Sequence, residues 1–182
     1  ENVAKKKAYY GFPLKQQSMH VQIWKDMLEK AGFKPEDVPT KWEDYWTFWC
    51  DKVQPAIRKA TGQRIYAVGQ PMGVESTDSF QSFYTFMDAY HVKLVDDDGK
   101  LLVDDPKVRD GLIHAMKDYT DTYIKGCTPP SSTTWKDPDN NVAFHNKTIL
   151  MTHHSTISIA AQWLQASTTP ALTAAHRSPG TP

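Results

Sequence analysis

The stretch Met19-His-Val-Gln-Ile-Trp-Lys-Asp-Met-Leu-Glu-Lys-Ala-Gly32 decides the fold class. In its first part Met19, Val21 and Ile23 alternate with polar residues, and this period of two predicts a strand. From Trp24 onward the apolar residues recur at helical spacing, which predicts a helix that Gly32 ends. The chain therefore passes from strand to helix within one short stretch.

The same succession continues on both sides. Upstream, Lys7-Ala-Tyr-Tyr-Gly-Phe-Pro13 predicts a short strand that runs into a loop. Thr40 and Glu43 form a capping-box pattern for the next helix downstream. In order, the periodicity predicts a helix over 42–57 that Pro55 bends or divides, a strand over 65–68, a helix over 80–90, two short strands around Asp98-Gly99, helices over 106–125 and 138–144, and a strand over 148–152. Alternating strands and helices favour an α/β architecture.

Composition and charge exclude several kinds of partner. Among 182 residues, 40% are hydrophobic and 23% charged, as in an ordinary globular protein. Lys plus Arg and Asp plus Glu both total 21, so no net field draws the chain to nucleic acid or to an anionic membrane. Because no apolar run reaches the roughly 18 to 20 residues that cross a bilayer, we expect no membrane span.

The cysteines and the C-terminal segment follow no such pattern. Cys50 and Cys127 lie far apart and outside any metal-binding or redox motif, so they either pair in an oxidising compartment or remain buried free thiols. Residues 161–182 are rich in small residues and Pro and lack apolar periodicity. We therefore expect a disordered or foreign tail after a domain that covers residues 1–160.

Catalytic patterns are missing from the sequence. It contains no nucleophile elbow, phosphate-binding loop or zinc-protease motif. Asp96-Asp97-Asp98 and Asp104-Asp105 would suit a paired-carboxylate hydrolase, but beside a turn and a helix start they are expected to be solvated structural acids. His153 and His154 are neighbours on a predicted strand and point to opposite faces, so they do not share one metal. We expect neither a metal nor a cofactor.

Polar and aromatic side chains in the predicted loops suit sugar hydroxyls. Amides and carboxylates bind hydroxyls in pairs, and a ring covers an apolar sugar face. The alternative is that the Asp/Asn cluster caps a helix or forms a turn and that Trp135 belongs to the core. The residues of this kind are Gln16, Gln17, Ser18, His20, Trp135, Asp137, Asp139, Asn140 and Asn141.

Five segments, taken in order, resemble the family 1 extracellular solute-binding proteins, the maltose-binding-protein-like receptors of ABC importers. They are Tyr10-Gly-Phe-Pro13, Trp24-Lys-Asp-Met-Leu-Glu-Lys-Ala-Gly32, Pro39-Thr-Lys-Trp-Glu-Asp-Tyr45, Asp98-Gly-Lys-Leu-Leu-Val-Asp-Asp-Pro106, and Ala143-Phe-His-Asn-Lys147 through Met151. In the last of these, Asn146 stands where Gly is usual. The resemblance covers residues 8–159.

The resemblance implies a truncated α/β chain, mainly the second lobe of a periplasmic-binding-protein-like receptor of type II, with three α/β/α layers and an interlobe crossing near 8–13. It implies a substrate-binding component of an ABC importer that captures a sugar or polyol without catalysis. The location is then periplasmic or extracellular, and the partners are the carbohydrate and the permease subunits. A carboxylate-dependent glycan hydrolase and a truncated lobe without ligand binding remain the alternatives.

Carried onto this sequence, the resemblance also implies a set of ligand contacts. Trp135 is the expected sugar platform, so Trp135→Ala should weaken binding without unfolding the lobe. Asn141 is the expected hydrogen-bonding partner beside it, with His154 and Ser155 opposite at a strand end. The full set is Gln16, Ser18, His20, Gln70, Met72, Trp135, Asn141, His154 and Ser155.

Overall fold

The computed structural model describes residues 11–12, 18–156 and 158–168. In this part of the chain, three strands form one sheet in the order β1-β3-β2. β1 (His20–Ile23) is antiparallel to β3 (Ile149–His154), and β2 (Tyr66–Val68) is parallel to β3. All three strands were predicted from the sequence, and β3 runs two residues further than expected.

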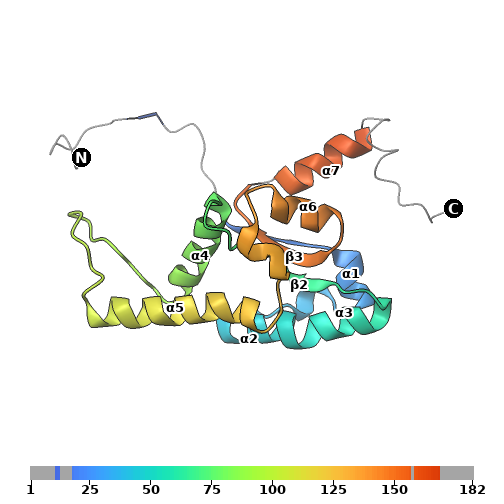
Figure 1. The fold of residues 1–182 in the computed structure, drawn as a ribbon, viewed down its shortest axis with the longest axis horizontal. Coiled ribbons are helices and arrows are strands. Elements are labelled where there is room, and N and C mark those ends of the chain that lie inside the picture. Colours follow the sequence, from blue (N-terminus) through green and yellow to red (C-terminus); the bar gives the residue numbers. More distant parts are fainter. Residues whose placement is uncertain (1–10, 13–17, 157, 169–182) are drawn as a thin grey trace.

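Helices connect and cover these strands (Figure 1). The predicted strand-to-helix passage is confirmed, because β1 leads directly into α1. The helices are α1 (Lys25–Lys30), α2 (Trp42–Thr47), α3 (Gln54–Thr61), α4 (Thr77–Ala89), α5 (Pro106–Ile124), α6 (Asp139–His145) and α7 (Ser158–Thr168), with short 3-10 turns at Pro35–Asp37 and Pro130–Thr134.

The sheet separates two hydrophobic clusters, which gives the expected three layers. One cluster contains Leu150 and Met151 of β3 with Leu28 of α1 and Ile57 of α3. A second cluster contains Tyr66 and Ile149 with Phe144 of α6 and Ile159 of α7. In Figure 1 the sheet accordingly lies between α6 and α7 above and α1 and α3 below. A third cluster joins α4 to α5 through Phe86, Met87 and Ala115.

The long helix predicted around Pro55 is continuous but changes its winding. α2 passes into a π-helical turn over Phe48–Val53, and α3 follows with Pro55 in its first turn. Pro55 has no N–H to donate to a carbonyl of the preceding turn. The wider π turn directly before it keeps the chain helical without that bond.

Two local predictions differ from the structure. Lys41 precedes α2 and no side chain caps it, so Thr40 and Glu43 form no capping box. The hairpin around Asp98-Gly99 is short: it has one bridge between Val95 and Leu101, and Asp96 closes the turn by accepting from the backbone N–H of Asp98 and Lys100. At the other end of the described chain, α7 spans residue 160, and Ile159 at its start is buried in the core.

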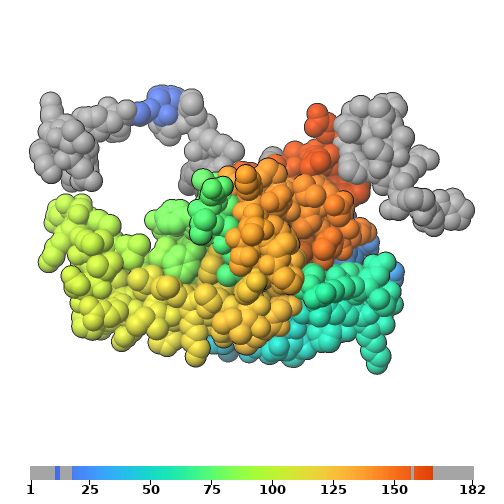
Figure 2. Space-filling model, in the orientation of Figure 1, coloured from blue at the N-terminus to red at the C-terminus, as the bar shows by residue number. Residues whose placement is uncertain are grey.

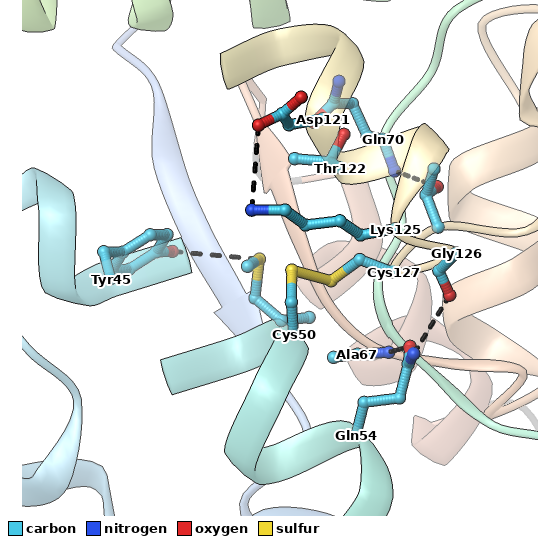
Figure 3. Close-up of a disulfide and its surroundings, with 12 residues drawn as sticks. Tyr45, Cys50, Gln54, Ala67, Gln70, Asp121, Thr122, Lys125, Gly126 and Cys127 are labelled. Carbon is cyan, nitrogen blue, oxygen red and sulfur yellow. Dashed lines mark hydrogen bonds and ion pairs between the residues drawn. A yellow bond between two sulfur atoms is a disulfide. The ribbon is translucent and has the colours of Figure 1, made fainter. Parts of the chain in front are cut away.

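Cys50 and Cys127 form a disulfide, which settles the alternative that the sequence left open. The bond joins the π-helical turn to the segment after α5, across a sequence separation of 77 residues and a Cα–Cα distance of 5.1 Å. Figure 3 shows the disulfide beside Lys125 and close to Gln54. A covalent link thus fixes the end of α5 to the helices that cover the sheet.

Gln54 protects the outer edge of β2. Its Oε1 accepts from the backbone N–H of Ala67 at 2.9 Å, and its Nε2 donates to the carbonyl of Gly126 at 3.0 Å (Figure 3). The side chain is only 6% exposed, so water does not replace these bonds easily. Gln54 therefore bonds a backbone N–H at the sheet edge that would otherwise pair with a further strand.

Gln54→Leu should lower the free energy of unfolding by about 2 kcal/mol, because it leaves the buried N–H of Ala67 and the partly buried carbonyl of Gly126 without partners. Urea denaturation would show this as a lower midpoint at unchanged slope. Gln63→Leu, at an exposed position, is the matched control and should change stability by less than about 0.5 kcal/mol. Equal effects of the two substitutions would show that the edge contacts contribute nothing.

Candidate ligand-binding site

Several chain segments meet at the carboxyl end of β3. β1 runs antiparallel to β3, so its first residue, His20, lies opposite His154. The first turn of α4 approaches from one side, and α6 and α7 begin nearby. In Figure 2 the green start of α4 lies against the orange segment that carries α6 on the upper surface. Ligands of α/β proteins commonly bind at this edge of a sheet.

His154 and Asp78 form the centre of this cluster. His154 is 5% exposed, and its Nδ1 lies 2.8 Å from the carbonyl oxygen of Thr156. Its Nε2 lies 3.9 Å from Oδ2 of Asp78, which is too long for a hydrogen bond. Burial raises the pKa of the Asp78 carboxyl, and the nearby His154 offsets part of that rise. The carboxylate is thus poorly solvated in the protein alone.

Asp137 holds the first turn of α4 in place from the loop before α6. Its carboxylate accepts from the hydroxyls of Ser76 and Thr77, at 2.7 and 2.6 Å, and from the backbone N–H of Asp78 at 3.1 Å. The bonds from Thr77 and Ser76 lower the pKa of the Asp137 carboxyl. The first turn of α4 is therefore held by a residue far along the chain.

Polar side chains of the cluster are only partly satisfied. Ser155 donates to Oε1 of Gln81, and Asn141 donates to the hydroxyl of Ser158 at 3.3 Å. Oδ1 of Asn141 is buried and makes no hydrogen bond within the described residues, and the buried Asn140 amide has the Asp78 carboxylate as its polar neighbour. Unsatisfied buried polar atoms call for a bound molecule or water. The cluster can therefore donate to and accept from a ligand.

α4 also carries an exposed aromatic pair. Phe80 is 59% and Tyr84 45% exposed, and their ring centroids lie 4.7 Å apart at a steep angle. Phe80 lies in the same helical turn as Asp78 and Gln81. Helical periodicity predicted one apolar face with Phe80, Tyr84 and Met87; the structure buries Met87 together with Phe86 and leaves Phe80 and Tyr84 exposed. The sequence indicated the exposed Phe80 and Tyr84 pair only by placing aromatic residues on more than one face of the helix.

The structure brings together four of the nine predicted ligand contacts. His20, Asn141, His154 and Ser155 lie at the edge described above, and His20 contacts the carbonyl of Thr156 at 2.9 Å. Ser18 is exposed just before β1, and Gln16 lies outside the described residues. The sequence did not indicate that Asp78, Gln81 and Phe80 belong to this site, because no local pattern connects α4 to the end of β3.

Gln70, Met72 and Trp135 lie in packed surroundings instead. Gln70 is 3% exposed and donates to the carbonyl of Tyr119 at 3.0 Å, and the backbone N–H of Met72 donates to Ser132. Trp135 is 7% exposed, packs in the cluster of Tyr66 and Phe144, and donates from its Nε1 to the Ser131 hydroxyl at 3.1 Å. Trp135 thus lacks the open ring face of a platform, because the sheet and α6 cover it.

The other acidic groups have structural roles, as expected from the sequence. Asp96 organises its own turn, and Asp105 caps α5 by accepting from the backbone N–H of Lys107 at 2.8 Å. Within the described residues, no group of three or more His, Cys, Asp or Glu side chains is placed to hold a metal ion. Asn146 has an ordinary right-handed backbone, and the left-handed position that favours Gly is Lys147, with φ of 55°.

His153 points away from His154, as strand geometry requires, and lies partly buried against Tyr45 of α2. Its Nε2 lies 3.0 Å from the Tyr45 hydroxyl, and burial lowers its pKa to about 4. The unfolded chain binds a proton at this residue at higher pH than the folded chain does, so stability falls as pH falls from the ordinary histidine pKa toward the folded value.

Acidification should therefore destabilise the fold through His153, by about 2 kcal/mol between about pH 7 and about pH 5. Urea denaturation at each pH measures the slope, and His153→Gln should make it shallower because it removes the proton without removing a partner for Tyr45. An unchanged slope in His153→Gln would mean that His153 is already charged in the folded state.

A sequence model of the bacterial extracellular solute-binding protein family matches residues 2–181. The chain belongs to this family. The solute-binding chain has no match among curated proteins. No helix among its described residues combines the length and apolar character needed to cross a membrane.

Solved structures confirm the fold of this solute-binding chain. MalE3 of T. maritima with maltose bound is 20% identical over 75% of the chain, with a TM-score of 0.58. An ABC transporter solute-binding protein from Thermotoga lettingae, bound with α-D-tagatose, is 25% identical over 75% of the chain, with a TM-score of 0.59. The chain spans 32% of the length of each of these structures.

Proposed function

We propose that this chain is the ligand-capturing lobe of a substrate-binding component of an ABC importer and binds a sugar or polyol at the carboxyl end of β3. The observation that carries the proposal is the cluster around Asp78 and His154, in which Oδ1 of Asn141 lacks a partner and the buried Asn140 amide interacts with Asp78. Phe80, two residues further along α4, supplies an exposed ring. Carboxylate, amide and hydroxyl groups beside a ring match the alternating polar edges and apolar faces of a sugar.

The division of the chain that we propose rests on the sequence segments that resemble the solute-binding family. We assign residues 1–160 to the second lobe, with the interlobe crossing near 8–13, and residues 161–182 to a tail that begins within α7. The opposite wall of the cleft then comes from protein outside this chain. Closure of two lobes around the ligand would be the signal that the permease subunits recognise. The maltose and tagatose bound to the similar structures support a carbohydrate ligand.

The disulfide supports a periplasmic or extracellular location. Such bonds form and persist in oxidising compartments and are rare where thiols are kept reduced. Cys127 is fully buried and lies in the same hydrophobic cluster as the core of the sheet. The bond therefore belongs to the folded architecture.

Capture without catalysis is the role that fits the two carboxylates of the cluster. A glycan hydrolase needs one carboxyl group as acid and a second as base or nucleophile. Asp137 cannot easily exchange a proton, because its two oxygens accept three hydrogen bonds from the start of α4. Asp78 is left as a single polar contact for a ligand.

Phe80→Ala should weaken sugar binding roughly tenfold, because it removes the apolar surface that covers one sugar face. The fold should keep its stability, since the Phe80 side chain is largely exposed. Isothermal titration with a panel of sugars and polyols measures the affinity, and thermal stabilisation by the same ligands provides a second readout. Ile113→Ala, at an equally exposed position of α5, is the control.

A panel in which no sugar or polyol binds would contradict the proposed function. Equal loss of affinity in Phe80→Ala and Ile113→Ala would place the site elsewhere on the chain.

A further inference from the structure

The candidate site offers more acceptors than donors to a ligand. The Asp78 carboxylate is 20% exposed, and Asn140 is the side chain whose hydrogen bonding lowers the pKa of Asp78. Oδ1 of Asn141 is a second buried acceptor and makes no hydrogen bond within the described residues. The buried donor of the group, the Asn140 amide, is therefore already directed to Asp78 rather than to a ligand. A ligand that completes this site must donate more hydrogen bonds than it accepts.

The charges around Asp78 are also unbalanced. Among the described residues neither Asp78 nor Asp137 makes an ion pair with Lys or Arg, and the basic side chain near Asp78 is the His154 imidazole, whose Nε2 lies 3.9 Å from Oδ2. Burial raises the pKa of the Asp78 carboxyl, and the negative charge of Asp137 adds to that rise. A largely buried carboxylate without a Lys or Arg partner is unfavourable, and a bound cation would stabilise it.

We propose that the ligand presents a protonated amine to Asp78, so that the site prefers amino sugars or amino polyols to neutral sugars and rejects acidic sugars. This inference rests on the proposed function. An ammonium group supplies three donors and no acceptor, which fits the excess of acceptors. Its charge-assisted bond to a carboxylate is about twice as strong as a neutral bond, whereas a sugar carboxylate would face Asp78 with like charge.

The test is isothermal titration of the full chain at about pH 7 with matched ligand sets on the gluco, galacto and manno scaffolds. Each set contains the neutral hexose, the hexosamines with the amine at carbon 2 or carbon 6, and the hexuronate. We expect a hexosamine to bind at least about tenfold more tightly than its neutral parent and the hexuronate to bind most weakly. The preference should weaken with added salt, because it is electrostatic.

Asp78→Asn should abolish the difference between amino and neutral sugars, since the amide keeps the shape and removes the charge. Asp88→Asn, an exposed acid at the far end of α4, should preserve the difference. Neutral sugars that bind as tightly as hexosamines, or a preference that survives in Asp78→Asn, would overturn the inference while leaving sugar capture intact. If no member of any set binds, the proposed function fails together with the inference.

Discussion

Replacing Cys50 and Cys127 together by alanine should lower the free energy of unfolding by about 4 kcal/mol. The disulfide closes a loop across a sequence separation of 77 residues, and opening so long a loop restores much conformational freedom to the unfolded chain. The loss is large relative to the stability of an ordinary domain, about 5–15 kcal/mol. Urea denaturation of the oxidised chain and of the double variant measures it.

Reduction provides the internal control for this prediction. A thiol reductant should shift the wild-type midpoint to that of the double variant and leave the variant unchanged. Wild type and variant that unfold at the same urea concentration under oxidising conditions would contradict a structural role of the disulfide. The consequence would extend to location, because the proposed periplasmic or extracellular setting draws support from this bond.

Trp135→Ala should destabilise the fold by about 3–5 kcal/mol, the range for removing a buried large aromatic side chain. Trp135 packs against Tyr66, Phe144 and Ile149, and its indole N–H donates to Ser131. The backbone of Trp135 is also close to Gly73, where an added Cβ would lie 2.0 Å from the Trp135 carbonyl oxygen. The loop before α6 and the loop after β2 would lose their common anchor.

Trp135→Phe is the graded control and should cost less, because a ring remains in the cluster. Thermal unfolding and urea denaturation give the stability, and sugar titration gives the binding. The sequence alone led to the opposite expectation, that Trp135→Ala weakens binding and leaves the fold intact. A variant that keeps its stability and loses ligand affinity would restore Trp135 as a sugar platform.

Much of the fold could be predicted because its signals are local. The alternation of Met19, Val21 and Ile23, the cap at Asp105 and the Gly stops each lie within a few residues of the element that they define. The same is true of the five segments that indicated the family. Local signals did not predict where a helix continues without a break or how far two segments pair. The π turn before Pro55 and the shortness of the hairpin near Asp98 depend on contacts that no local pattern encodes.

Only the part of the candidate site that lies on β1 and at the end of β3 could be predicted from the sequence. His154 and Ser155 follow a predicted strand, and β1 brings His20 to them through antiparallel pairing. Asp78, Gln81 and Phe80 belong to a helix whose sequence indicated only an apolar face. They reach the site because Asp137 bonds to the start of α4 across 59 to 61 positions of the chain. Trp135 was expected at the site but lies in the core, because a sequence does not distinguish a buried indole from an exposed one.

The most direct test is to map the binding of a sugar on the isotope-labelled chain by NMR. The proposed site predicts that the amide shifts of Asp78, Gln81, Asn141 and Ser155 move together as ligand is added and give one dissociation constant. The surface hollow beside α1, lined by Lys25, Glu29 and Phe33 among others, should show no change. Shifts confined to that hollow, or no shifts with any sugar or polyol, would contradict ligand capture at the carboxyl end of β3.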